Sequence, residues 1–200
     1  PGELATLMLD LQNAGCHNIN LVTPSHVVPQ ILAALPWAIE RGLRLPLVYN
    51  TSGYDAVDTL ALLDGVVDVY MPDFKVWDPD VAETVLTARD YPAVARAAIA
   101  EMHRQVGDLT TDSRGIARRG LLVRHLVLPG EQADTAKVLH WLADLSPDTA
   151  VNVMGQYRPA GRVAREHGRW PRLERAVAGT EHRCALHAAR DAGLTRLVED

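Results

Sequence analysis

The chain has 200 residues, about half of them apolar, and a formal net charge of −5. This length and composition suit one globular domain with a sizeable core, so we expect a single domain over residues 1–200. The negative charge gives no general reason to expect a nucleic-acid partner, and no apolar run reaches the roughly 20 residues that cross a bilayer. The two cysteines, Cys16 and Cys184, are too few for a disulfide framework and favour a reducing, cytoplasmic location.

Helical and strand-like patterns alternate along the chain. Pro36 predicts a kink or break in the second helix, and Ser52 or Asp55 is the candidate cap of the third. In chain order the predicted elements are a helix at 3–14, a strand at 19–22, a helix at 27–41, a strand at 45–49, a helix at 55–63, a strand at 66–71, helices at 78–87 and 91–106, a polar hairpin or loop at 107–120, a strand at 121–128, a helix at 134–145, a strand at 149–154 and a helix at 180–192.

This alternation predicts parallel strands joined by crossover helices. The strands read as nearly continuous apolar runs, which is typical of a sheet covered on both faces. Five such strands are too few for a full eight-stranded barrel. An open doubly wound sheet and a partial barrel therefore remain as the two candidate architectures.

Polar residues follow each predicted strand, at the end where parallel α/β proteins bind ligands. Arg124 lies inside the apolar run LLVRHLVL, and a buried arginine requires a partner such as Asp73 or a ligand carboxylate. Lys75 and Arg124 together suit an anionic ligand, while Asp73 with Asn50 suits a ribose, a cationic group or a hard cation. The candidate binding residues are Thr23, Ser25, Asn50, Ser52, Asp73, Lys75, Arg124 and Gln156.

Two further groups carry weaker signals. His182, Cys184 and His187 lie in the last predicted helix, but their spacing matches no strong zinc pattern. The arginine-rich run at 162–170 suits a solvated helix or loop, and it could also face a protein or peptide partner. No phosphate-binding loop, dinucleotide fingerprint or metalloprotease motif is present in the sequence.

Several long phrases resemble the radical S-adenosylmethionine (radical SAM) proteins, in particular the group similar to the pyruvate formate-lyase activating enzyme. The resemblance covers residues 3–159 and the terminal AGLTRL. Its phrases are HNINLVTPSHVVPQI, LPLVYNTSGYDAVDTLALLDGVVDVYMPDFK, YPAVARAAIAEMHRQVG, GIARRGLLVRHLVLPG and VNVMGQYRP.

The resemblance implies a partial TIM-like barrel of six β/α units, of which about five are present. It implies a [4Fe–4S] cluster held by a C-x₃-C-x₂-C loop, and reductive cleavage of S-adenosylmethionine to a 5′-deoxyadenosyl radical that abstracts hydrogen. A glycyl-radical enzyme would be the protein substrate in the activating-enzyme group, and an electron donor would be a second partner. This chain has no C-x₃-C-x₂-C. We therefore expect the first strand and the cluster loop to precede Pro1, and the 200 residues to be inactive alone.

The resemblance also assigns positions. Asn50-Thr51-Ser52-Gly53 is similar to the T-N-G of the third family strand, and Asp73-Phe74-Lys75 matches the D-L-K that follows the fourth. Arg124–Gly130 matches the fifth-strand pattern, and Gln156 falls at the end of the sixth. The second strand departs from the family, because residues 23–26 (TPSH) replace the G-G-E that holds the amino group of the cofactor.

These positions imply that Lys75 and Arg124 neutralise the cofactor carboxylate or organise the substrate. Asp73 and Asn50 would bind ribose hydroxyls, or a cation beside that carboxylate. Two alternatives remain open. One is another β/α-barrel enzyme, such as a lyase that uses Lys75 to form a Schiff base. The other is a non-catalytic binding domain without a cluster.

Overall fold

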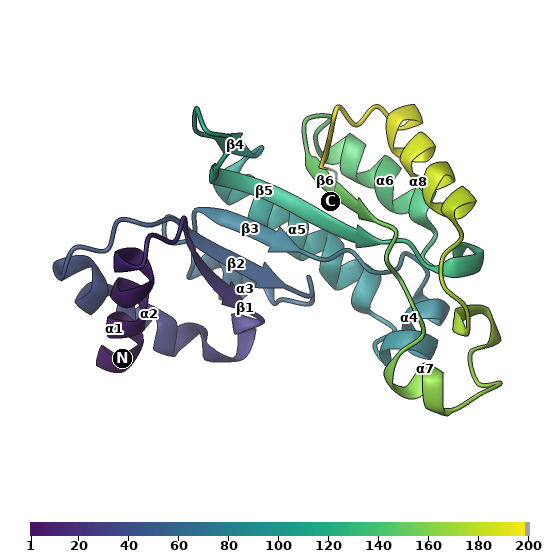
Figure 1. Ribbon diagram of the computed structural model, residues 1–200, viewed down its shortest axis with the longest axis horizontal. Coiled ribbons are helices and arrows are strands. Elements are labelled where there is room, and N and C mark those ends of the chain that lie inside the picture. Colours follow the sequence, from purple (N-terminus) through teal and green to yellow (C-terminus); the bar gives the residue numbers. More distant parts are fainter. Residues whose placement is uncertain (199–200) are drawn as a thin grey trace.

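The computed structural model describes residues 1–198, which form an α/β structure built on one seven-stranded sheet (Figure 1). Six parallel strands lie side by side in the order β1-β2-β3-β5-β6-β7, which is also their order along the chain, and β4 pairs antiparallel with β5. The strands are β1 (Ile19–Val22), β2 (Leu47–Thr51), β3 (Val69–Pro72), β4 (Thr110–Thr111), β5 (Ala117–Leu126), β6 (Ala150–Met154) and β7 (Arg196–Val198).

Helices join successive parallel strands, as the alternating pattern predicted. Short 3₁₀ turns at Pro24–Val27, Pro129–Glu131 and Pro171–Leu173 complete the connections. The helices are α1 (Gly2–Asn13), α2 (Val28–Glu40), α3 (Val57–Ala61), α4 (Pro79–Leu86), α5 (Tyr91–Val106), α6 (Thr135–Leu145), α7 (Gly161–Arg165) and α8 (Gly179–Asp191).

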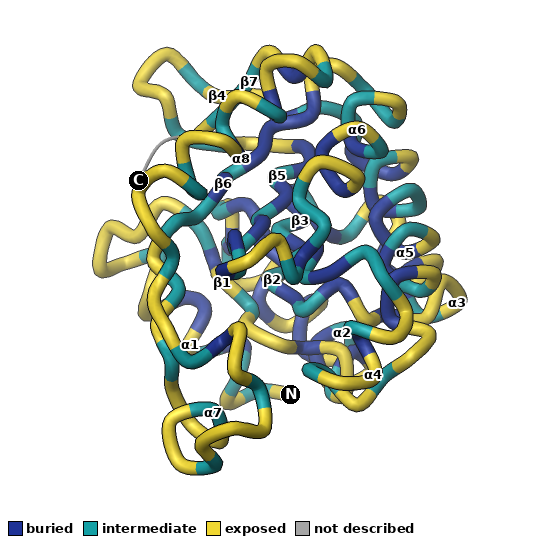
Figure 2. Tube along the Cα trace, turned by 90° about the vertical axis from the view of Figure 1, so that its right-hand side faces the viewer, coloured by how far each residue is buried: buried dark blue, intermediate teal, exposed yellow. Residues whose placement is uncertain are grey.

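The two large apolar clusters lie between the helices and one face of the sheet, here called the outer face. Tyr49, Tyr70 and Val123 are outer-face residues that pack with α5, α6 and α8. Ile19 and Leu47 share that face and pack with α1 and α2. Buried segments accordingly run along the central strands and the facing sides of α5 and α6 (Figure 2).

The opposite face, here called the inner face, carries a smaller apolar cluster that includes no helix residue. Val48, Val69 and Ala150 pack there with Leu109, which precedes β4. A guanidinium nitrogen of Arg196 on β7 contacts the Leu109 carbonyl, so this loop closes the inner face at the amino ends of the strands. Among the described residues, both large apolar clusters that include helix residues therefore lie on the outer face.

Local predictions had mixed outcomes. Helix α5 has the predicted bounds, and residues 107–120 form the predicted hairpin, from which β5 emerges earlier than expected. Pro36 does not break α2, which continues to Glu40. Asp55 does not cap α3, because its carboxylate is buried and accepts hydrogen bonds from the Tyr49 and Thr51 hydroxyls instead. Within residues 1–198, no helix combines the length and apolar character needed to cross a bilayer.

Candidate ligand-binding site

Four of the predicted site residues form one connected cluster at the carboxyl ends of β2, β3 and β5. Asp73 lies between two cations, with Oδ2 2.5 Å from Lys75 Nζ and Oδ1 2.7 Å from an Arg124 guanidinium nitrogen. The same Arg124 nitrogen, Nη2, donates to Asn50 Oδ1 at 3.0 Å. The expected pairing of Arg124 with Asp73 is thus confirmed.

Strand register explains why these side chains meet. Side chains alternate between the two faces of a strand, so the residues two positions beyond inner-face Val48 and Leu122 also face inward. These residues are Asn50 and Arg124. The backbone of Asp73 bridges the strand that carries Arg124, and its N–H donates to the Thr51 carbonyl at 2.9 Å.

The cluster has an excess of positive charge. It combines two cationic groups with one carboxylate, although the whole chain carries a net charge of −5. A guanidinium has five N–H donors, yet both contacts of Arg124 use Nη2, and its Nε has no hydrogen-bond partner among the described residues. The Arg124 side chain is 29% exposed and that of Lys75 is 37% exposed, so an anion can approach both.

Tyr91, at the start of α5, holds the loops after β2 and β3 in place through hydrogen bonds to their backbone. Its hydroxyl accepts the Lys75 backbone N–H at 2.9 Å and lies 2.9 Å from the Ser52 carbonyl and 3.0 Å from the Asp73 carbonyl. Burial, together with the neighbouring acidic charges, raises the pKa of the Tyr91 hydroxyl, which therefore stays a neutral donor. Gly53 has φ +78°, and a Cβ there would lie 2.3 Å from the Asp73 carbonyl oxygen.

His125 fixes the same segment from the outer face. The ring is fully buried, with Nδ1 2.6 Å from the Phe74 carbonyl and Nε2 2.9 Å from the Thr135 hydroxyl. A carbonyl can only accept, so Nδ1 carries the proton and Nε2 accepts from Thr135. Burial lowers the pKa of His125 to about 4, so the ring is neutral near pH 7.

The charged cluster opens into a cavity of about 350 Å³, which is within the size range of small-molecule sites. Asp73, Lys75 and Arg124 line one side. Apolar side chains form the remaining walls: Val76, Val85, Leu86, Leu126, Leu128, Met154, Val163 and Leu173, with Tyr157. The segment after β6 closes part of this cavity, and the Tyr157 hydroxyl donates to the Leu173 carbonyl at 2.9 Å.

The other predicted residues lie at the edge of the site or outside it. Thr23 follows β1 with φ +51°, and its N–H donates to the Asn50 carbonyl, but its side chain and that of Ser25 are exposed. Ser52 is tied to the site through its backbone carbonyl. Gln156 is exposed and does not line the cavity.

Sequence reasoning missed Tyr91, Gly53 and the outward orientation of His125. The motif N-T-S-G, which contains Gly53, could have indicated its role. Tyr91 begins a helix 16 residues after Lys75, and no sequence pattern indicates that its hydroxyl contacts the site. Among the described residues no group of three potential metal ligands occurs, and the His182 ring bonds to the Val153 carbonyl at 2.8 Å.

The structure is an α/β protein with a sheet of mainly parallel strands and a cavity lined by charged side chains at the carboxyl ends of those strands. No family model matches the sequence. The chain is 29% identical over its full 200 residues to the uncharacterized protein MJ0674 of Methanocaldococcus jannaschii. The chain spans about half of that relative, 53% of its length.

Proposed function

We propose that this chain binds S-adenosylmethionine as part of a radical SAM core with a partial β/α barrel. The observation that carries the proposal is the cluster of Asn50, Asp73, Lys75 and Arg124, which opens into the cavity of about 350 Å³. The matches of D-F-K and of the Arg124–Gly130 pattern to the family motifs support it. They concern the same residues that the fold brings together.

The winding of the sheet supports the barrel part of the proposal. Strand order follows chain order without a reversal, whereas a doubly wound sheet reverses its strand order at a switch point. Right-handed crossovers place connecting helices on one face of such a sheet, and residues of α1 to α6 and of α8 form the two large apolar clusters on that face. A sheet wound in this way has an inner face available for a ligand, as in β/α barrels.

The cavity suits the parts of S-adenosylmethionine. Lys75 and Arg124 can bind its carboxylate, and Arg124 keeps donors that Asp73 and Asn50 do not use. Leu126 and Met154 supply an apolar wall of the kind that suits an adenine ring. Asp73 faces a cation on each carboxylate oxygen, so its expected role becomes that of orienting Lys75 and Arg124. This arrangement disfavours the alternative of a hard cation at Asp73.

The ribose role then falls to Asn50. Its Oδ1 accepts from Arg124, and its Nδ2 amide can donate to a ribose hydroxyl that extends beyond the cavity, because Asn50 lies next to Arg124 but not in the cavity lining. The part of the chain in this account is binding, orientation and charge neutralisation, while the reactive bond belongs to the cofactor.

The described residues do not fit an iron–sulfur cluster. Cys16 and Cys184 are both exposed and lie on α1's C-terminal loop and on α8, and no third cysteine exists in the sequence. Residues outside these 200 would have to hold a cluster. We therefore derive no redox step for this chain, and the radical chemistry and the glycyl-radical partner stay predictions for a longer protein.

The geometry gives less support to a Schiff-base lyase. Imine formation needs a free amine, and Lys75 Nζ is engaged with Asp73 at 2.5 Å. The sequence has one other lysine, Lys137. Borohydride trapping followed by peptide mapping would therefore assign any adduct to one of two positions.

Titration calorimetry with S-adenosylmethionine tests the proposed function. We expect Lys75→Ala to weaken binding about tenfold or more, because it removes a charge-assisted contact to the carboxylate. The matched control is Lys137→Ala. Lys137 is exposed, its Nζ lies 2.9 Å from Asp134 Oδ2, and it does not line the cavity. Equal affinities for the two variants, or no binding by the unchanged chain, would contradict the proposal.

A further inference from the structure

The segment that follows β6 is strongly basic, although the whole chain is acidic. Residues 158–175 contain six arginines and two glutamates, whereas the net charge of the chain is −5. All six arginines are exposed. They are Arg158, Arg162, Arg165, Arg169, Arg172 and Arg175.

Half of these arginines have no acidic partner among the described residues. Arg162 and Arg169 both pair with Glu166, at 2.9 and 2.7 Å. Arg175 pairs with Glu181 on α8 at 2.7 Å. No ion pair within residues 1–198 involves the remaining three, which are Arg158, Arg165 and Arg172.

Trp170 attaches this basic segment to α4. Its indole N–H donates to the Thr84 carbonyl at 3.1 Å. The guanidinium carbons of Arg169 and Arg162 lie 4.6 and 5.3 Å from the centre of the indole ring, which is the range of cation–π contacts. The stacking holds part of the positive charge at a defined place on the surface.

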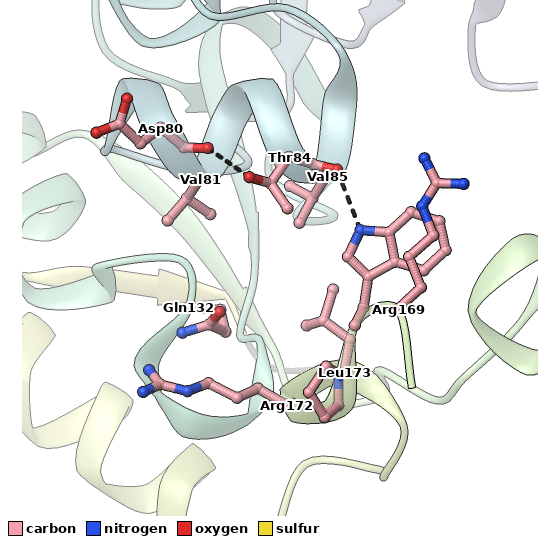
Figure 3. Close-up of a pocket in the computed structure, with 10 residues that line it drawn as sticks. Asp80, Val81, Thr84, Val85, Gln132, Arg169, Arg172 and Leu173 are labelled. Atoms are coloured by element: carbon pink, nitrogen blue, oxygen red, sulfur yellow. Dashed lines mark hydrogen bonds between the residues drawn. The ribbon is translucent and has the colours of Figure 1, made fainter. Parts of the chain in front are cut away.

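A groove of about 330 Å³ lies between α4 and this segment (Figure 3). Its apolar surface comes from Val81 and Val85 on α4 and from Leu173 on the facing segment. Figure 3 shows the Arg172 side chain extended beside Gln132, across the opening from Val81. The groove thus combines an apolar floor with an unpaired cation at its rim.

We propose that this groove binds a segment of a partner protein in which carboxylates flank an apolar side chain. The apolar side chain would enter between Val81 and Leu173, and the carboxylates would pair with Arg172 and the neighbouring exposed arginines. Charge complementarity supports this occupant, since the basic surface belongs to an otherwise acidic chain. The inference does not depend on the proposed binding of S-adenosylmethionine, although Val85 and Leu173 line both the groove and that cavity.

A nucleic acid fits the same surface less well. Such binding depends on many phosphate contacts, and only three of the six exposed arginines of this segment have no acidic partner among the described residues. A bare polyanion would also leave the apolar floor unused. These features favour the acidic peptide.

The test is fluorescence anisotropy with the 200-residue chain and labelled pentapeptides, each with two glutamates on either side of one variable residue. We expect the peptides with central phenylalanine or leucine to bind about tenfold more tightly than the one with central glycine, because the apolar side chain is buried. Binding should weaken as salt is added, because the contacts are exposed ion pairs.

Arg172→Gln should lower the affinity for the tightest-binding peptide about fivefold, because it removes one partly exposed ion pair between the peptide and the chain. Arg172 makes no ion pair with another described residue, so the substitution removes surface charge and leaves the fold intact. Arg118→Gln is the matched control, since Arg118 is also exposed but lies in the β4–β5 hairpin and pairs with Asp112. Equal effects of the two substitutions, binding of no peptide, or tighter binding of an oligonucleotide of equal charge would each overturn the proposal.

Discussion

His125 should make the stability of this protein depend on pH in a way that one substitution removes. The ring is fully buried, and burial lowers its pKa to about 4, against about 6.5 in an unfolded chain. Between these two values the unfolded state binds a proton that the folded state does not bind. The free energy of unfolding must therefore fall as the pH falls through this window.

The size of the effect follows from the same two values. Between pH 7 and pH 5 the unfolded chain gains about 2 kcal/mol from protonation of this histidine, while the folded ring stays neutral. That loss is a large part of the roughly 5–15 kcal/mol by which domains are stable. Below about pH 4 the folded ring also takes up a proton, and the loss from this group levels off.

Urea unfolding at pH 7 and pH 5, with the unchanged chain and His125→Gln, measures this contribution. The variant should lose stability at pH 7, because its amide cannot reproduce both hydrogen bonds, to the Phe74 carbonyl and the Thr135 hydroxyl. Its further loss on going to pH 5 should be about 2 kcal/mol smaller than that of the unchanged chain. The same pH dependence in both proteins would refute the assignment of a neutral, buried ring.

Two substitutions at the rear of the site should also have defined effects. Tyr91→Phe should lower the free energy of unfolding, measured by urea denaturation, by about 2 kcal/mol, because it leaves the Lys75 N–H without its buried acceptor. The control is Tyr54→Phe, which removes an exposed hydroxyl from the adjacent ring and should lower the free energy of unfolding by less than about 1 kcal/mol. Gly53→Ala should destabilise the protein more than Gly65→Ala by thermal unfolding. Both glycines have φ near +75°, but only at Gly53 does the new Cβ meet backbone, 2.3 Å from the Asp73 oxygen. Equal losses within either pair would show that the contact contributes nothing.

The sequence predicted those parts of the structure that depend on local pattern. The amphipathic, alanine-rich run Tyr91–Val106 has one apolar face, and it forms α5 with the predicted bounds. The cluster of Asn50, Asp73 and Arg124 was predictable because parallel strands end at one edge of a sheet. Strand β7 was missed, since three residues give too short a pattern to recognise.

The parts that could not be predicted depend on contacts between distant segments. Asp55 resembled a helix cap, but the fold buries it against the Tyr49 hydroxyl, which local sequence does not reveal. His125 follows Arg124 in the apolar run LLVRHLVL, and its position in the strand directs it to the helices on the outer face, where it is fully buried. Gln156 follows β6 as expected, yet the chain turns so that it misses the cavity.

The central claim is that Arg124 and its neighbours bind the carboxylate of S-adenosylmethionine. Titration calorimetry with S-adenosylmethionine and with 5′-methylthioadenosine, which lacks the amino-acid part, tests it on the unchanged chain and on Arg124→Gln. We predict that the unchanged chain prefers S-adenosylmethionine, and that Arg124→Gln reduces this preference about tenfold or more while its affinity for 5′-methylthioadenosine stays the same. Equal affinity of the unchanged chain for the two compounds, or a preference that survives in Arg124→Gln, would contradict the account.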